Sequence, residues 1–182
     1  DHPVKDMDSW ENQCKWRLEP STPGRFDYLR KAMNAAVEAR KKGLFIQQRI
    51  GGGCMYLRSL IGPTGVLYAL CEKPDLIHDC MKTWFELADA VTARHQEHVD
   101  FDEVFLAEDI CYNNGLLYSP DLVKEYLFPY YQQLLSNIRS RRNDAGRTLH
   151  VQVDTDGRCE DAIDLYREGI GMDVMSPFEV AS

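Results

Sequence analysis

Long helical patterns alternate with short apolar runs along this chain, which limits the folds that it can adopt. After Pro74 the apolar positions step by three and four residues from Ile77 to His95, which predicts one long amphipathic helix ending near Val99. Val104–Ala107 follows as an apolar run bounded by charges, typical of a buried strand in a parallel sheet. This alternation favours an α/β fold.

The other elements are predicted from caps, breakers and periodicity. The predicted helices are a first one capped by Asp8 and closed at Pro20, one from Pro23 to Arg40 stopped by Gly43, and a short one around Leu57–Ile61. Two more follow: a helix introduced by Ser119 and kinked or divided at Pro129, and a helix over Cys159–Glu168 followed by Gly169. The predicted strands cover Leu44–Ile50 and Thr148–Val153, and a last strand opens at Asp173–Met175.

This order predicts a parallel sheet with helical crossovers, and both an open doubly wound sheet and a barrel fit it. The chain opens on a helix and stops a few residues after a strand, and an eight-stranded barrel takes about 250 residues. We therefore expect a (β/α)8 TIM-barrel type fold. In this interpretation residues 1–182 form a single partial barrel domain that covers about the central half and lacks the first and last strands.

Composition narrows the functional classes. The 182 residues are 44% hydrophobic and 27% charged, as in one globular domain, and the net charge of −8 disfavours nucleic-acid and anionic-membrane partners. Neither a membrane span nor a signal peptide is recognisable, which predicts a cytoplasmic protein. Six cysteines without a C-x-x-C pair are expected to be reduced core residues rather than a zinc or disulfide framework.

Acidic residues follow three predicted strands, and these are our candidate catalytic residues. Glu108 and Asp109 come after the second strand, Asp154 and Asp156 after the third, and Glu179 after the last. In a barrel the carboxyl ends of strands meet at one rim, where the acids would raise each other's pKa or recruit a cation.

A structural explanation of the same acids remains open. Asp154 or Asp156 could cap the helix that begins near Arg158, and Glu108 or Glu179 could pair with basic loop residues. Such roles would leave the rim without a shared site.

Other candidates are weaker. Gly51–Gly53 follows a strand but Tyr56 replaces the last glycine of a dinucleotide loop, so backbone mobility or close packing explains it as well. His95 and His98 could hold a metal, yet complementing the helix dipole is the favoured interpretation. We predict no metal ligands.

Four residues are candidates for substrate binding. Tyr112 and Asn113 would supply hydrogen bonds beside the acids. His150 lies within a strand, either as a core imidazole or as a substrate contact, and Arg58 either faces a cavity or caps a turn.

Four motifs in a consistent order resemble the uroporphyrinogen decarboxylase superfamily. They are Glu108–Pro120 (EDICYNNGLLYSP), Phe128–Tyr131 (FPYY), Val153–Gly157 (VDTDG) and Met175–Glu179 (MSPFE), and the match runs from His2 onward. The resemblance implies a (β/α)8 barrel and a function among the tetrapyrrole decarboxylase and the corrinoid-linked methyltransferases.

Departures from the family pattern shape the functional expectation. Zinc methyltransferases of the superfamily carry H-x-C-G, where this chain has Asp154 and Asp156, so zinc and any tightly bound cofactor are not expected. An acidic rim also disfavours a substrate with eight carboxylates. The pattern is more similar to a zinc-lacking subgroup, which implies methyl transfer from a small substrate with a corrinoid protein as possible partner. Tetrapyrrole decarboxylation and a non-catalytic barrel that binds a corrinoid, a tetrapyrrole or a cation are the alternatives.

Overall fold

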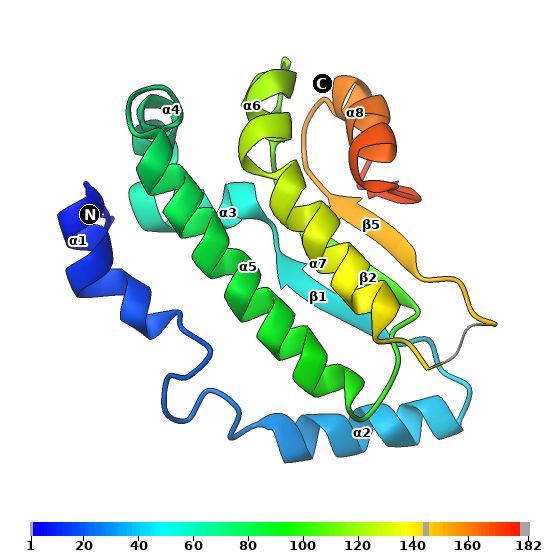
Figure 1. Cartoon of the computed structure of the whole chain (residues 1–182). Coiled ribbons are helices and arrows are strands. Elements are labelled where there is room, and N and C mark those ends of the chain that lie inside the picture. The colour runs from blue at the N-terminus through cyan, green and yellow to red at the C-terminus, as the bar shows by residue number, and fades with distance from the viewer. Residues whose placement is uncertain (1, 144–145, 179–182) are drawn as a thin grey trace.

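The computed structural model describes residues 2–143 and 146–178 and has a mixed α/β fold around a parallel sheet (Figure 1). The four strands lie in the order β1-β2-β5-β6, and each neighbouring pair is parallel. Their bounds are β1 (Gln47–Gly51), β2 (Glu103–Ala107), β5 (His150–Asp154) and β6 (Val174–Ser176). The predicted parallel sheet is confirmed; its closure into a barrel is not shown.

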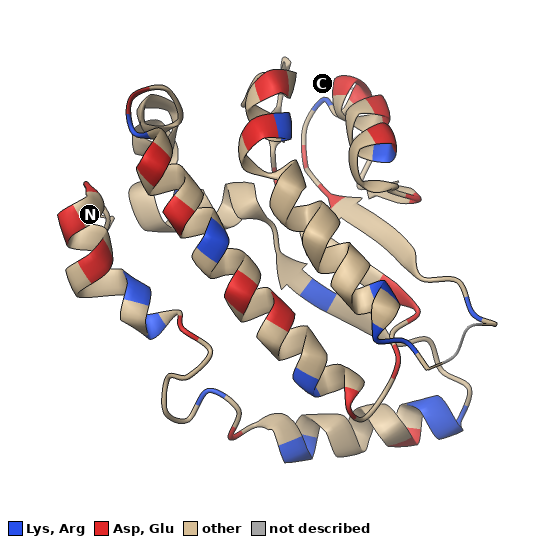
Figure 2. Ribbon diagram, viewed as in Figure 1, with Lys and Arg blue, Asp and Glu red and all other residues tan. Residues whose placement is uncertain are grey.

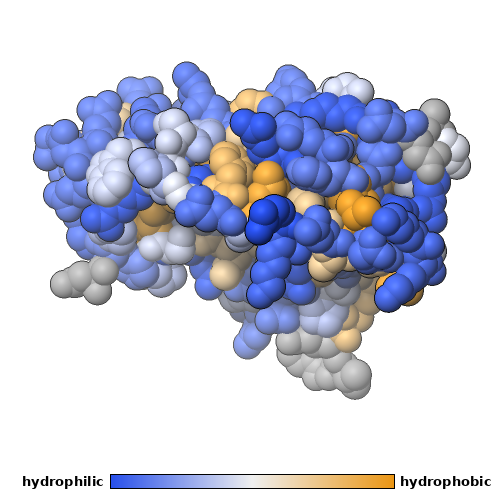
Figure 3. All heavy atoms as spheres, turned by 90° about the horizontal axis from the view of Figure 1, so that it is seen from below, coloured by the Kyte–Doolittle hydropathy of each residue, from blue (hydrophilic) through white to orange (hydrophobic). Residues whose placement is uncertain are grey.

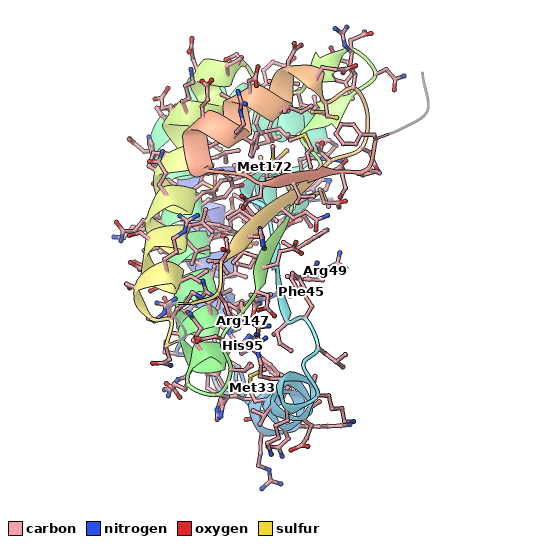
Figure 4. All side chains as sticks on the ribbon, turned by 90° about the vertical axis from the view of Figure 1, so that its right-hand side faces the viewer. Met33, Phe45, Arg49, His95, Arg147 and Met172 are labelled. Atoms are coloured by element: carbon pink, nitrogen blue, oxygen red, sulfur yellow. The ribbon has the colours of Figure 1, made fainter. Side chains whose placement is uncertain are left out.

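The helices gather on one side of this sheet. Two long ones, α5 (Pro74–Gln96) and α7 (Phe128–Ser140), pack against each other along one face. Figure 4 shows the opposite side without a helix along it and Arg49 pointing away from the helices. The remaining helices are α1 (Met7–Ser9), continued by π-helical Trp10–Cys14 and 3-10 Lys15–Arg17, then α2 (Leu29–Lys41), α3 (Gly53–Ile61), α4 (Pro63–Glu72), α6 (Pro120–Tyr126) and α8 (Glu160–Ile170).

Strand alternation separates the core from the uncovered side. Val104 and Leu106 of β2 are buried against the helices, as are Val151 and Val153 of β5. The opposite side, which we call the open face, carries polar and aromatic side chains in the same registers. These are Gln47, Arg49, Glu103, Phe105, His150, Gln152 and Asp154.

Contacts among neighbours order the open face. The Arg49 guanidinium lies over the Phe105 ring, 4.3 Å from its centroid. Gln47 donates to Glu103 at 2.6 Å, and Gln152 pairs with Ser176 of β6 at 2.7 Å. The open face is therefore a polar layer of cross-strand pairs rather than a second apolar core.

Several predicted elements are confirmed with their physical cause. Helix α5 spans most of the predicted range, and Ser119 caps α6 by accepting from the Leu122 N–H. The helix after it divides at Leu127, because Pro129 in the first turn of α7 lacks an amide donor.

Other boundaries differ from the sequence prediction. Asp6, not Asp8, caps the first helix by accepting from the Ser9 N–H. Helix α2 begins at Leu29 rather than Pro23, because Gly24 takes a φ of +78° that no helix continues. Strand β1 starts only at Gln47, where its parallel pairing with β2 begins.

Two elements were not predicted, and one helix runs longer than expected. Pro63 starts α4, and a hairpin of β3 (Cys111–Tyr112) and β4 (Gly115–Leu116) follows β2. Helix α8 continues past Gly169, whose missing side chain makes room for the Phe128 ring. It ends at Ile170, and the next residue, Gly171, takes a φ of +68°.

The surface is mostly polar. Acidic residues are spread over the helices, including α6 and α8, as Figure 2 shows. Figure 3 shows mainly hydrophilic side chains on the side seen from below, with a smaller apolar area between them. Taken singly, none of the described helices has the length and apolarity to cross a membrane; α3 and α4 meet that criterion only as a pair bent by 102°. Five cysteines are buried as expected, whereas Cys71 is exposed.

Candidate functional site

The loops after β2 and β5 are joined into one unit. The N–H groups of Glu108 and Asp109 both donate to the Asp154 carbonyl, at 2.9 and 3.0 Å. The buried Thr155 hydroxyl then accepts from the N–H groups of Ile110 and Cys111, each at 3.0 Å. Backbone and side-chain bonds therefore hold the two strand ends in a fixed relation.

Asp109 is anchored to helix α3. Its φ is +48°, in the left-handed region that non-glycine residues adopt at a cost. Arg58 of α3 donates to its carbonyl at 2.9 Å and to its carboxylate at 2.8 Å, and both side chains keep about a third of their surface exposed. Arg58, a predicted substrate-binding residue, thus forms an ion pair with Asp109 at the rim.

Three of the predicted acids lie close enough to influence one another. Desolvation raises the pKa of Asp154 above its usual value, and the neighbouring charges of Asp156 and Asp109 raise it further, while Arg49 opposes them. Asp154 is half-buried and Asp156 is exposed. We call Asp109, Asp154 and Asp156 the rim carboxylates.

Glu108 does not belong to this group, which corrects the sequence prediction. Its side chain is fully buried and contacts the hydroxyls of Tyr131 and Tyr166 from the helices. The reason is strand alternation, because Glu108 shares the parity of the inward residues Val104 and Leu106. The alternative of a basic loop partner is also wrong, since its partners are tyrosines.

The environment of Glu108 changes its titration. Burial raises the pKa of its carboxyl to about 7, although hydrogen bonds from Tyr131, Tyr166 and the backbone of Cys54 and Gly53 lower it. A group of this kind exchanges a proton near neutral pH.

Tyr112 and Asn113 lie on the hairpin beside the rim, and both are exposed. The hairpin is attached to the loop after β5, because the Tyr112 carbonyl accepts from the Arg158 N–H at 3.0 Å. A side chain at Gly157 would lie 2.8 Å from the Tyr112 backbone, so glycine allows this close approach. These two predicted residues are therefore near the site.

His150 lies away from the rim. It starts β5, whereas Asp154 ends it, four residues and about 13 Å along the strand. Its nearest charged partner is Asp173, at 3.8 Å. Neither Asp154 nor Asp156 is the N-cap of α8, because Cys159 occupies that position. Glu179 lies outside the described residues.

The helical histidine is accounted for by hydrogen bonds. His95 is buried and bonds to the Tyr28 hydroxyl at 2.8 Å and the Gln48 side chain at 2.6 Å. Burial and the nearby His98 lower its pKa, which disfavours the charged form that complementing the helix dipole requires. Within residues 2–143 and 146–178, no group of three or more His, Cys, Asp or Glu is placed to hold a metal ion.

Sequence reasoning missed several residues that shape the site. They are Arg49 and Phe105 on the open face, Thr155 between the loops, and Tyr131 and Tyr166 around Glu108. Successive side chains along a strand point to opposite sides of the sheet. This alternation could have predicted that Asp154 and Thr155, and likewise Glu108 and Asp109, lie on different sides. The tyrosine positions carried no such signal, since an apolar helix face predicts burial but not the partner of a hydroxyl.

Comparison with protein-family models gives no match, and comparison with curated proteins gives no significant match. The resemblance to the decarboxylase superfamily therefore stays a prediction.

Proposed function

We propose that this chain is the central part of a (β/α)8-barrel enzyme that uses the rim carboxylates to bind a small substrate and to exchange a proton with it during methyl transfer. The observation that carries the proposal is the hydrogen bond from the Asp109 N–H to the Asp154 carbonyl at 3.0 Å, which joins the carboxyl ends of two adjacent parallel strands where three acids gather. Ligand sites of parallel α/β folds lie at these ends.

The open face supports the barrel interpretation. In a barrel the side of the sheet that faces away from the helices becomes the interior. Here that side carries Arg49, Phe105 and Gln152 in ordered contacts, and Asp154 lies at its carboxyl end. A closed barrel would place the rim carboxylates around the mouth of this interior.

The rim has the groups needed for acid catalysis. Asp154, whose pKa is raised, is the proposed proton donor, while Arg58 holds Asp109 in an ion pair. In the proposed step the bond between the methyl group and a substrate nitrogen or oxygen breaks. The heteroatom keeps the bonding pair and takes the proton from Asp154, and the methyl group forms a bond with a two-electron nucleophile.

The identity of that nucleophile is inferred from the family resemblance. A reduced corrinoid on a partner protein would accept the methyl group through its cobalt(I) electron pair. Two carboxylates in place of His and Cys suit a hard cation or a cationic substrate better than zinc. The work assigned to this chain is to bind, orient and protonate the substrate.

A second function is favoured by one observation. Arg49 on the open face and Arg58 at the rim are cations that could bind substrate carboxylates, as a tetrapyrrole decarboxylase requires. However, Arg58 is already paired with Asp109 and Arg49 stacks on Phe105, so both side chains already have a partner. We therefore place decarboxylation second to methyl transfer.

The experiment mixes the purified protein with cob(I)alamin and a panel of methylated amines and methyl ethers, and follows methylcobalamin by its visible absorption. We expect Asp154→Asn to lower turnover at least 100-fold with substrate affinity retained, and Glu86→Gln, an exposed acid on α5, to leave it unchanged. Unchanged turnover in Asp154→Asn would overturn the proposal. Loss of calorimetric affinity alone, without turnover in either protein, would instead support a non-catalytic binding barrel.

A further inference from the structure

Glu108 lies where three helices meet the sheet. Tyr131 of α7 donates to both of its carboxylate oxygens, at 2.8 and 2.7 Å, and Tyr166 of α8 donates at 3.0 Å. All three side chains are buried. A fully buried polar group needs hydrogen-bond partners in place of water, and two tyrosine hydroxyls provide them for Glu108.

The third helix, α3, contributes its amino terminus. Its first residue, Gly53, donates its N–H to the Tyr131 hydroxyl at 2.5 Å, and the backbone of Gly53 and Cys54 also interacts directly with the Glu108 carboxylate. The N-cap residue, Gly52, has no side chain to accept these donors. Glu108 therefore replaces the missing cap from another part of the chain.

Steric fit confirms how closely this acid approaches the helix. A methyl group on Gly52 would lie 1.6 Å from Glu108 Oε2 and 2.8 Å from Glu108 Cα. Only a glycine leaves room for the carboxylate. Close packing therefore explains Gly52 and Gly53, whose added side chains would meet neighbouring atoms at less than 3 Å.

The same helix reaches the rim further along. Arg58, five residues after Gly53, donates to the carbonyl and carboxylate of Asp109. Glu108 and Asp109 are consecutive, and the Glu108 side chain is fully buried whereas the Asp109 carboxylate is about a third exposed. One strand end therefore holds α3 at two points, at its first turn and at Arg58.

We propose that Glu108 is a positioning residue, which fixes the first turn of α3 and thereby keeps Arg58 against Asp109. Its functional meaning rests on the proposed role of the rim, but its structural effect is measurable without substrate. A merely structural core acid would contribute to global stability alone. A positioning residue changes α3 and Arg58 selectively.

Glu108→Gln tests the inference because an amide presents an NH2 group where a carboxylate oxygen accepts. In the full chain we would measure amide hydrogen exchange over residues 53–56 and the guanidinium signals of Arg58 by NMR, with the amides of β5 as reference. Ile138→Val is the matched control, since it removes one buried methyl group from α7 away from Glu108. We expect exchange over residues 53–56 to rise at least tenfold in Glu108→Gln and the hydrogen-bonded Arg58 signals to be lost.

In Ile138→Val the pattern over α3 should match that over β5. Equal effects of Glu108→Gln on α3 and β5, or no effect on Arg58, would overturn the inference. Tyr166→Phe removes a single bond to the carboxylate and serves if Glu108→Gln does not fold. In Tyr166→Phe we expect a smaller rise in amide exchange that is again selective for α3. Equal changes over α3 and β5 in this variant would also overturn the inference. Because no substrate is used, this outcome is independent of the turnover test.

Discussion

Arg58 binds Asp109 twice, through the backbone carbonyl at 2.9 Å and the carboxylate at 2.8 Å, at a residue whose φ of +48° is costly for a side chain. Backbone strain at a strand end is maintained only where surrounding contacts over-determine it. Here the Asp154 carbonyl and Arg58 supply those contacts. The conformation presents a carboxylate at the rim at the expense of stability.

Replacing Asp109 by glycine should therefore raise the free energy of unfolding while it removes a rim carboxylate. Asp109→Gly removes the left-handed penalty of roughly 1–2 kcal/mol and loses a partly exposed ion pair of about 0–1 kcal/mol, for a net gain of about 1 kcal/mol. Urea unfolding of the variant against Asp109→Asn measures this. Asparagine keeps a tolerance for positive φ and removes only the charge. A glycine variant less stable than the asparagine variant would show that no strain is stored.

Two adjacent glycines form a matched pair for the packing of Glu108. We expect Gly52→Ala to lower the free energy of unfolding by about 3 kcal/mol or more, because the new methyl group displaces a buried carboxylate. Gly51→Ala meets no atom within 4 Å and should change stability by less than about 0.5 kcal/mol. Thermal unfolding of both variants is the measurement, and equal losses would contradict the packing described here.

Stability should depend on the protonation of Glu108. Its folded pKa of about 7 lies above the ordinary 4.5, so the protonated carboxyl favours the folded state. This contribution is complete below about pH 4.5 and is lost as pH rises through 7, and it amounts to no more than on the order of 3 kcal/mol. Unfolding of the wild type and Glu108→Gln between pH 4.5 and 8 measures the difference, which should shrink as pH rises.

Neighbouring groups do not obscure this comparison. Burial raises the pKa of Tyr131, Tyr166 and Tyr118, and that of Cys54 to about 12, so all four stay neutral across this range. His95, whose pKa burial lowers, titrates with the opposite sign but equally in both proteins. A pH-independent difference between wild type and variant would show that Glu108 does not change its protonation state.

Much of the fold could be predicted from local signals. Regular apolar spacing after Pro74 identified α5, and the Ser119-Pro120 pair identified the start of α6. Alternating β-branched and polar residues identified β5. These signals are strong because each reports a requirement of the element itself, such as a cap, a fixed φ or a buried side of a strand.

The features that could not be predicted from the sequence depend on tertiary contacts. Residues Cys111–Leu116 form a hairpin with two-residue strands, too short for any periodicity, and Thr155 is what holds its start. Glu108 and Asp109 look equivalent in sequence, yet one faces three helices and the other the rim. Their separation follows from strand parity, but the tyrosines that make a buried acid tolerable come from residues 23 and 58 positions away.

The pKa of the Asp154 carboxyl, measured from its 13C signal during an NMR pH titration, shows whether the rim carboxylates share one site. In the wild type it should lie above the ordinary 3.8, and it should fall in Asp156→Asn because a neighbouring negative charge is removed. An ordinary pKa that does not respond to Asp156→Asn would show that the rim carboxylates do not meet, and would contradict a shared functional site at these strand ends.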